Sequence, residues 1–153
     1  MYQKILVPYD GSRFSKKALS EAVKIAKAAG SSVYLCMVVN VGSVVPPGSL
    51  LGFVKSASAG DLHRRLLKSA KAEAESMLAA QMKYCKANNV RSYYKIIIDG
   101  NTAEEILKVA KKSSINLIVI GSQGLHGIGK VKTLGSVSRR VSEAASCPVL
   151  IVR

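Results

Sequence analysis

The sequence predicts a single α/β domain with a three-layer, doubly wound architecture, in which helices cover both faces of a five-stranded parallel sheet. Three observations support this prediction. The chain has 153 residues, the size of one domain with one core, and 48% of them are apolar, which is enough for a packed interior. Short apolar runs alternate with helical patterns along the chain, as right-handed βαβ crossovers require. Residues 1–153 are therefore expected to form one domain.

Five apolar segments are predicted to be the strands of this sheet. Strands that are buried on both faces of a parallel sheet appear as continuous β-branched runs and not as alternating patterns. The segments with this character are Ile5–Val7, Ser32–Val39, Tyr93–Ile98, Leu117–Ile120 and Val149–Val152.

The first two helices are predicted between the first three strands. Ser15 is expected to cap a helix with a regular apolar face, and Gly30 to end it, because glycine readily adopts the left-handed conformation that follows a helix. Asp61 is expected to cap a long second helix that ends near Asn88. Residues 41–60 show few charges and no period, and such a connection is usually a functional lid or a mobile loop.

Two further helices are predicted in the second half of the chain. Thr102 and Glu105 have the spacing of a capping box, which predicts that a helix begins there. Another helix is expected to start around Gly135 and to run to Ala145, because Pro148 disfavours its extension.

Composition narrows the function classes. No apolar run approaches the roughly 20 residues that span a bilayer, and Ile5–Val7 is too short for the apolar part of a signal peptide, so a soluble cytoplasmic protein without membrane insertion is expected. The three cysteines lack metal-ligand spacing and are expected to be reduced and structural. The net charge of +14 favours anionic partners, whether nucleotide, nucleic acid or an acidic surface.

A glycine-rich stretch follows the fourth predicted strand, beginning with Gly121 and Gly124 and leading to a helix at Gly135. Glycines let the backbone approach a phosphate closely, and a helix N-terminus adds free N–H donors and a positive dipole end. Ser136 and Ser138 can add hydroxyl donors. The pattern indicates an anion site, although turn glycines in a surface loop would look similar.

Asp10 follows the first strand, and ligands of open α/β sheets bind outside the carboxyl ends of the strands. Asp10 is therefore expected to hold a ribose hydroxyl or Mg²⁺; the alternative is a turn-forming Asp before Gly11. The sequence has neither the glycine spacing of a P-loop nor the Gly-x-Ser-x-Gly motif of a nucleophile elbow. We therefore expect a binding protein in preference to an enzyme.

The chain resembles the universal stress protein family over essentially its whole length. The resemblance rests on three segments: Lys4–Ser12, Ile118–Gly124 and Gly135–Ser138 followed by Cys147–Val152. It implies a flavodoxin-like, Rossmann-like fold with strand order 3-2-1-4-5 and a homodimer formed through the last strand.

The resemblance to the ATP-binding branch of the family also implies a site for ATP and Mg²⁺. Glycines and the following helix would wrap the phosphates, the tip of the first strand would contact ribose, adenine and, through Asp10, the metal, and Val38 would line the adenine pocket. The residues so implied are Pro8, Tyr9, Asp10, Val38, Gly121, Gly124, Gly135, Ser136 and Val137.

One departure from the family pattern concerns the gap between Gly124 and Gly135. The ATP-binding branch has nine residues between these glycines, whereas this chain has ten, from Leu125 to Leu134. We expect the extra residue to be absorbed as a bulge near Gly127 or Gly129.

Three functions remain open from the sequence. The leading hypothesis is an ATP-binding regulatory protein of the stress-response type. The second is a slow Mg²⁺-dependent ATPase or phosphotransferase that uses Asp10. The third is a basic nucleic-acid-binding protein, suggested by the net charge and by a cluster formed by His63, Arg64, Arg65, Lys68 and Lys71.

Overall fold

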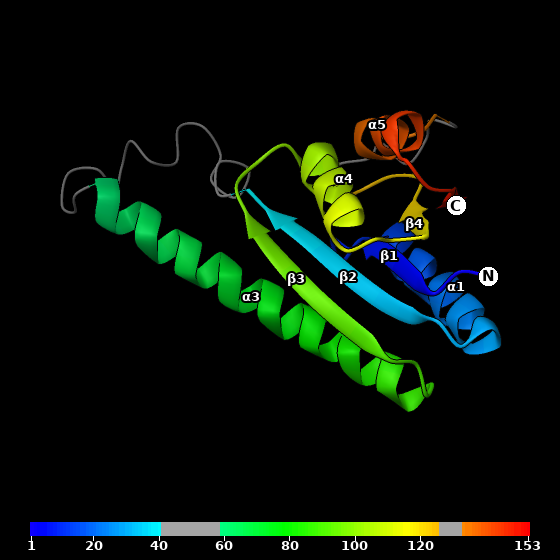
Figure 1. Ribbon diagram of the computed structural model, residues 1–153. Helices are drawn as coiled ribbons and strands as arrows, with labels where there is room; N and C mark the ends of the chain where they lie inside the picture. The colour runs from blue at the N-terminus through cyan, green and yellow to red at the C-terminus, as the bar shows by residue number, and fades with distance from the viewer. Residues whose placement is uncertain (41–58, 126–132) are drawn as a thin grey trace.

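Five parallel strands form one sheet in the order β3-β2-β1-β4-β5 (Figure 1). The computed structural model describes residues 1–40, 59–125 and 133–153 of the chain. The predicted doubly wound sheet and its strand order are confirmed. The strands are β1 Lys4–Pro8, β2 Ser32–Val39, β3 Ser92–Ile98, β4 Leu117–Gly121 and β5 Val149–Val152.

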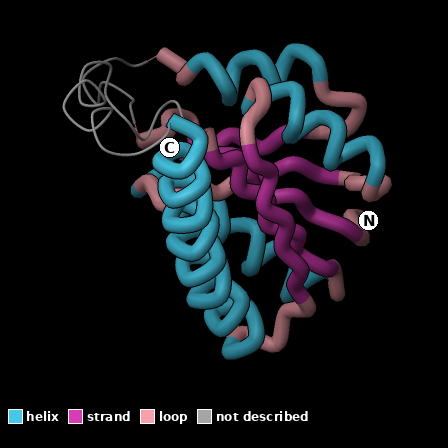
Figure 2. The backbone as a smooth tube through the Cα atoms, turned by 90° about the vertical axis from the view of Figure 1, so that its left-hand side faces the viewer, coloured by secondary structure: helices cyan, strands magenta, loops and turns pink. Residues whose placement is uncertain are grey.

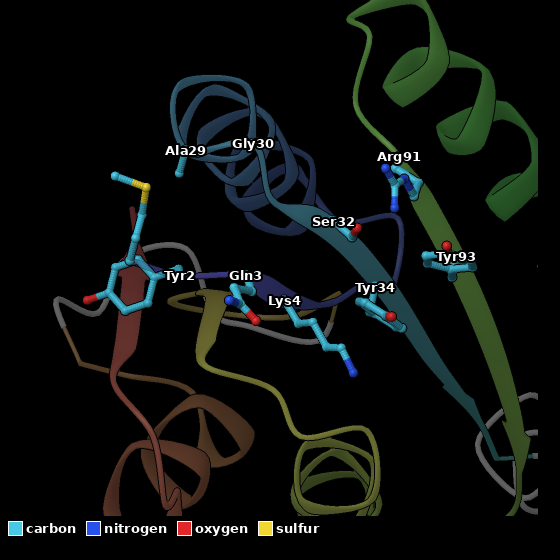
Figure 3. A pocket seen from close by; sticks show the side chains of 10 residues that line it. Tyr2, Gln3, Lys4, Ala29, Gly30, Ser32, Tyr34, Arg91 and Tyr93 are labelled. Carbon is cyan, nitrogen blue, oxygen red and sulfur yellow. The ribbon is translucent and has the colours of Figure 1, made fainter.

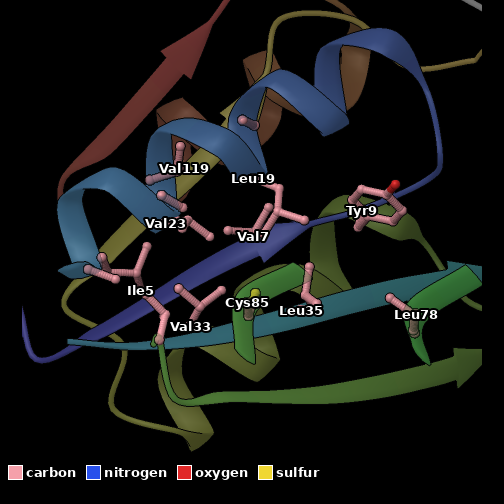
Figure 4. Packing of buried hydrophobic residues seen from close by; sticks show 14 of the residues in the cluster. Ile5, Val7, Tyr9, Leu19, Val23, Val33, Leu35, Leu78, Cys85 and Val119 are labelled. Atoms are coloured by element: carbon pink, nitrogen blue, oxygen red, sulfur yellow. The ribbon is translucent and has the colours of Figure 1, made fainter. Parts of the chain in front are cut away.

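The helices cover the sheet in two layers (Figures 1 and 2). Helices α1 (Arg13–Ala29) and α3 (Ala59–Ala87) pack on one face, and α4 (Thr102–Lys112) and α5 (Ser136–Ala144) pack on the other. The alternation of side chains along each strand divides the core in the same way. In β1, for example, Ile5 and Val7 belong to the cluster under α1 and α3 (Figure 4), whereas Leu6 belongs to the cluster under α4.

Helix α1 begins one turn earlier than the sequence predicted. Its N-cap is Ser12, which has extended backbone angles and whose hydroxyl oxygen accepts a hydrogen bond from the Ser15 N–H at 3.1 Å. The prediction of Ser15 as the cap was wrong, because Ser15 already has its place in the first turn and its hydroxyl donates to the Ser12 carbonyl. The predicted end is confirmed: Gly30 adopts the left-handed conformation with φ 67°.

Two other helix starts also differ from the prediction. The N-cap of α4 is Asn101, whose side-chain oxygen accepts from the Glu104 N–H at 3.2 Å, so the predicted capping box was displaced by one residue. Helix α3 begins at Ala59, which places Asp61 in its first turn. The rest of the predicted irregular segment, residues 41–58, lies outside the described residues. None of the helices described here is long and apolar enough to cross a membrane.

Candidate functional site

A pocket of about 440 Å³ lies at the carboxyl ends of β1, β2 and β4, beside the N-terminus of α5. We call it the carboxyl-edge pocket. The structure brings all nine sequence-predicted site residues to its lining, although they come from four separate segments of the chain. They are Pro8, Tyr9, Asp10, Val38, Gly121, Gly124, Gly135, Ser136 and Val137.

Asp10 joins two loops at the edge of this pocket. Its Oδ1 accepts a hydrogen bond at 2.9 Å from the N–H of Ser12, the N-cap of α1. Its Oδ2 accepts one from the Leu125 N–H at 3.1 Å, in the segment that follows β4. Each carboxylate oxygen can accept more than one hydrogen bond, so Asp10 keeps acceptor capacity for a ligand while it holds the two loops together.

Gly121 and Gly124 allow two close approaches that a side chain would prevent. A Cβ at Gly121 would lie 2.7 Å from the backbone carbonyl carbon of Phe14 in α1. A Cβ at Gly124 would lie 2.8 Å from Oδ2 of Asp10. Gly121 is thus required by the packing of α1 against β4, and Gly124 by the position of the Asp10 carboxylate.

The N-terminus of α5 is fastened to the end of β4 by backbone groups. The Gly135 N–H donates to the Ser122 carbonyl at 2.8 Å. Ser138 is 2% exposed, and its hydroxyl lies 2.9 Å from that same carbonyl oxygen and 3.0 Å from the Gly135 carbonyl oxygen. The prediction of Ser138 as a hydroxyl donor toward an anion was therefore wrong, because its one hydroxyl hydrogen is donated to a backbone carbonyl oxygen.

The first turn of α5 is well suited to an anion. Gly135 is its N-cap and supplies no side-chain hydrogen bond, so the first N–H groups have no capping oxygen. No acidic residue lies in this turn, and Arg139 and Arg140 are exposed on the next one. Ser136 is exposed at the start of the helix. Free donors, a positive dipole end and nearby cations all favour negative charge here.

The ten-residue gap does not separate the two glycine segments. Gln123 donates from Nε2 to the Thr133 carbonyl at 3.1 Å, which closes the base of the connection. Gly135 consequently lines the same pocket as Gly124. The predicted bulge at Gly127 or Gly129 falls within residues 126–132, which lie outside the described part of the chain.

The pocket has an apolar wall that the sequence revealed only in part. Val38 was predicted, but Cys36, Ile106 and Ile120 also line it. These three side chains belong to the core cluster between the sheet and α4. In the sequence they look like ordinary buried strand and helix positions, so only the folded structure shows that one end of this cluster opens into a pocket.

Tyr9 lines the pocket, and its ring also belongs to the core cluster on the other face of the sheet. Its side chain packs with Val7 and Leu78 on the α1 and α3 side of the sheet (Figure 4) and is 2% exposed. The hydroxyl has no hydrogen-bond partner among the described residues. Burial, and secondarily the Asp10 carboxylate, raise the pKa of this hydroxyl, so it stays protonated.

The Cys36 thiol gives a pH-dependent test of the pocket wall. Burial raises its pKa from 9.0 to about 11, because the thiolate would lose its hydration there. The neutral thiol therefore stabilises the folded protein fully below pH 9, and this contribution is lost as the pH rises to about 11. One pKa unit corresponds to about 1.4 kcal/mol, so the loss can reach about 3 kcal/mol.

The measurement is denaturant unfolding of the wild type and Cys36→Ala below pH 9 and near pH 11. The variant removes the titrating group and leaves a small cavity at all pH values, so the stability advantage of the wild type is expected to shrink as the pH rises. A difference that stays constant over this range would show that Cys36 titrates as an exposed thiol.

Comparison with known proteins agrees with this architecture. The universal stress protein family model matches residues 1–153. The chain is 37% identical over 155 residues to the universal stress protein YxiE of Bacillus subtilis, covering 100% of both chains. It is 33% identical to the universal stress protein MJ0531 of Methanocaldococcus jannaschii, covering 100% of this chain and 83% of that protein.

Solved structures share the fold. The structure of MJ0577 from Methanocaldococcus jannaschii superimposes with a TM-score of 0.81 at 25% identity, over 99% of this chain and 96% of that one. A universal stress protein in complex with cAMP gives 0.69 at 23% identity, covering 99% and 97%. The Archaeoglobus fulgidus protein in complex with dAMP gives 0.65 at 19% identity, covering 99% and 98%. The family match over the whole sequence and the shared fold together show that the present chain belongs to the universal stress protein family.

Proposed function

We propose that the carboxyl-edge pocket binds an adenine nucleotide, ATP with Mg²⁺, and that the chain acts as a nucleotide-dependent regulatory protein. The observation that carries the proposal is the convergence of all nine predicted residues on one pocket. Its volume of about 440 Å³ falls within the usual range of small-molecule and cofactor sites. Structures of two other family members contain cAMP or dAMP, so nucleotide binding has precedent in the fold.

The lining of the pocket offers suitable groups for each part of a nucleotide. Val38, Ile106 and Ile120 offer an apolar surface for a planar base. The uncapped first turn of α5 offers N–H donors for phosphate oxygens. Asp10 lies at the same edge of the sheet and provides acceptors for ribose hydroxyls.

The described residues fit Mg²⁺ only together with phosphate. Asp10 is the one acidic side chain among the described residues that line the pocket. No group of three or more His, Cys, Asp or Glu side chains that could hold a metal occurs in the described ranges. Mg²⁺ is commonly held by one or two carboxylates and completed by phosphates and water, so we propose that it enters with the nucleotide and contacts Asp10.

Isothermal titration of the protein with ATP, in the presence and absence of Mg²⁺, tests this function. Ser136→Asp is the informative variant, because its negative charge would face the phosphates while still suiting the helix N-terminus. We expect it to weaken ATP binding by at least about tenfold without loss of stability, since like charges brought together across an interface cost several kcal/mol. Ser146→Asp, at an exposed position after α5, is the charge-matched control and should bind like the wild type. A wild-type protein without affinity for adenine nucleotides would exclude the proposal.

The regulatory proposal includes a homodimer formed through β5. In the described structure, β5 pairs only with β4, so its other edge is open to another strand. Leu150 on this strand is 40% exposed. An open apolar edge strand favours pairing with a second chain. Sedimentation that finds only a monomer at high protein concentration would contradict this part of the proposal.

A further inference from the structure

A second pocket, of about 610 Å³, lies at the opposite edge of the sheet, at the amino ends of β1, β2 and β3 (Figure 3). We call it the amino-edge pocket. It shares no lining residue with the carboxyl-edge pocket. The nucleotide site proposed above makes no use of it. Its side chains of chemical interest are Tyr2, Lys4, Ser32, Tyr34, Arg91 and Tyr93.

Two tyrosines form a stacked aromatic pair in this pocket. The parallel register places Tyr34 of β2 beside Tyr93 of β3, with ring centroids 5.0 Å apart and an angle of 30° between the rings. Tyr34 is partly buried against the α4 side of the core, whereas Tyr93 is 46% exposed. None of the described helices lies in front of the amino-terminal halves of β2 and β3 in Figure 1, while α3 runs behind them. The pair therefore presents an open aromatic surface at the edge of the sheet.

Cations without acidic partners surround this aromatic pair. Lys4 places its Nζ 5.9 Å from the centre of the Tyr34 ring and donates to the Ser113 carbonyl at 3.0 Å. Arg91 is exposed and directly precedes β3, the edge strand that carries Tyr93 (Figure 3). No acidic side chain lines the pocket, and no ion pair between described residues involves Lys4 or Arg91. Lys95, two residues beyond Tyr93, extends the positive charge along the same face of β3.

We propose that the amino-edge pocket binds single-stranded nucleic acid, with a base stacked on Tyr93 and the flanking phosphates on Arg91 and Lys4. Aromatic platforms beside cations are the usual means of holding unpaired strands without sequence preference. The charge of +14 supplies the long-range attraction. A duplex offers phosphates but keeps its bases stacked on one another, and an acidic peptide offers carboxylates but no planar partner for the ring. An unpaired strand supplies a base for the ring and phosphates on both sides of it for the two cations, whereas a free nucleotide carries phosphate on one side of its sugar.

The structure changes how the aromatic residues of this chain are interpreted. In the sequence, Tyr93 and Tyr94 are the adjacent pair, but neighbouring residues of a strand point to opposite faces of the sheet. The partner of Tyr93 is Tyr34, which comes from a different strand and is brought beside it by the register. The basic residues of α3 that suggested nucleic-acid binding from the sequence take no part in this pocket.

Fluorescence anisotropy with a labelled oligothymidylate of about ten nucleotides tests the proposal. We expect the wild type to bind at low salt and to lose affinity steeply as salt rises. Tyr93→Ala should weaken binding by about 5- to 150-fold, the range measured for loss of one base–aromatic stack. Tyr93→Phe keeps the ring and should restore binding to near the wild-type value. Arg91→Gln should weaken binding and reduce the slope of log affinity against log salt by about one.

Matched controls separate this surface from general positive charge. Tyr84→Ala removes a tyrosine that is 40% exposed on α3, and Lys16→Gln removes a cation on α1; neither residue lines the amino-edge pocket. Both should bind like the wild type, and saturating ATP should not displace the oligonucleotide. The proposal is overturned by absence of binding at low salt, by full binding in Tyr93→Ala, by equal losses in the controls, or by displacement with ATP. Because the readout does not require ATP binding, its failure is distinct from failure of the nucleotide proposal.

Discussion

Replacing Gly121 by alanine is expected to lower the free energy of unfolding by about 3 kcal/mol, although it adds one methyl group. The added Cβ would lie 2.7 Å from the backbone carbonyl carbon of Phe14 and 2.8 Å from its Cβ. Backbone atoms cannot rotate away as the end of a flexible side chain can, so α1 must shift from β4. That shift would disturb two buried elements that share the core cluster around Leu19 and Val119.

Urea unfolding of Gly121→Ala beside Gly60→Ala measures this effect with a matched control. Gly60 lies in α3, and a Cβ there would meet no atom within 4 Å. Because alanine is a better helix former than glycine, Gly60→Ala should leave the stability unchanged or raise it by up to about 1 kcal/mol. If Gly121→Ala unfolds at the same denaturant concentration as the wild type, the contact between α1 and β4 is less tight than its geometry indicates.

The sequence predicted the sheet well because its signal is local and repeated. Each predicted strand is a continuous apolar run, and a helical pattern lies between each strand and the next, so the parallel sheet follows from general rules of connection. The helix starts were less well predicted. At each of two helix starts, two good capping residues lie within one turn: Ser12 and Ser15 before α1, and Asn101 and Thr102 before α4. The sequence does not show which residue of each pair has the extended backbone that a cap requires.

The residues of the candidate site were predicted more completely than their structural roles. All nine line one pocket, because the ends of parallel strands meet at one edge of the sheet. The sequence nevertheless treats Gly121, Gly124 and Gly135 alike, as places where the backbone can approach a phosphate. Their neighbours differ, and these come from distant parts of the chain: Phe14 for Gly121 and Asp10 for Gly124. Such pairings depend on tertiary packing and leave no local pattern in the sequence.

The difference between these glycines leads to the second large expected effect, in which Gly124→Ala weakens ATP binding by about 10- to 100-fold. A Cβ at Gly124 would lie 2.8 Å from Oδ2 of Asp10, the oxygen that accepts the Leu125 N–H. The carboxylate would have to turn away, which moves the acceptor proposed for the ribose and the metal; a charge-assisted hydrogen bond from the ligand to this acceptor is worth about 1.5–3 kcal/mol of binding. The Leu125 N–H that loses Oδ2 is exposed and can bond to water instead, so the fold itself should lose little stability.

Gly135→Ala is the matched variant on the other side of the same pocket. Its Cβ would meet the Gln123 Cα and the Ser122 carbonyl oxygen at 3.4 Å, which is ordinary contact, so ATP affinity should change by less than about threefold. Its cost should appear in stability instead, up to about 1 kcal/mol, because alanine is a poorer N-cap than glycine for α5. Titration with ATP should therefore show the larger loss of affinity for Gly124→Ala, and urea unfolding should show the larger loss of stability for Gly135→Ala. Equal losses of affinity would mean that both glycines contact the nucleotide directly and that Asp10 does not transmit the effect of Gly124.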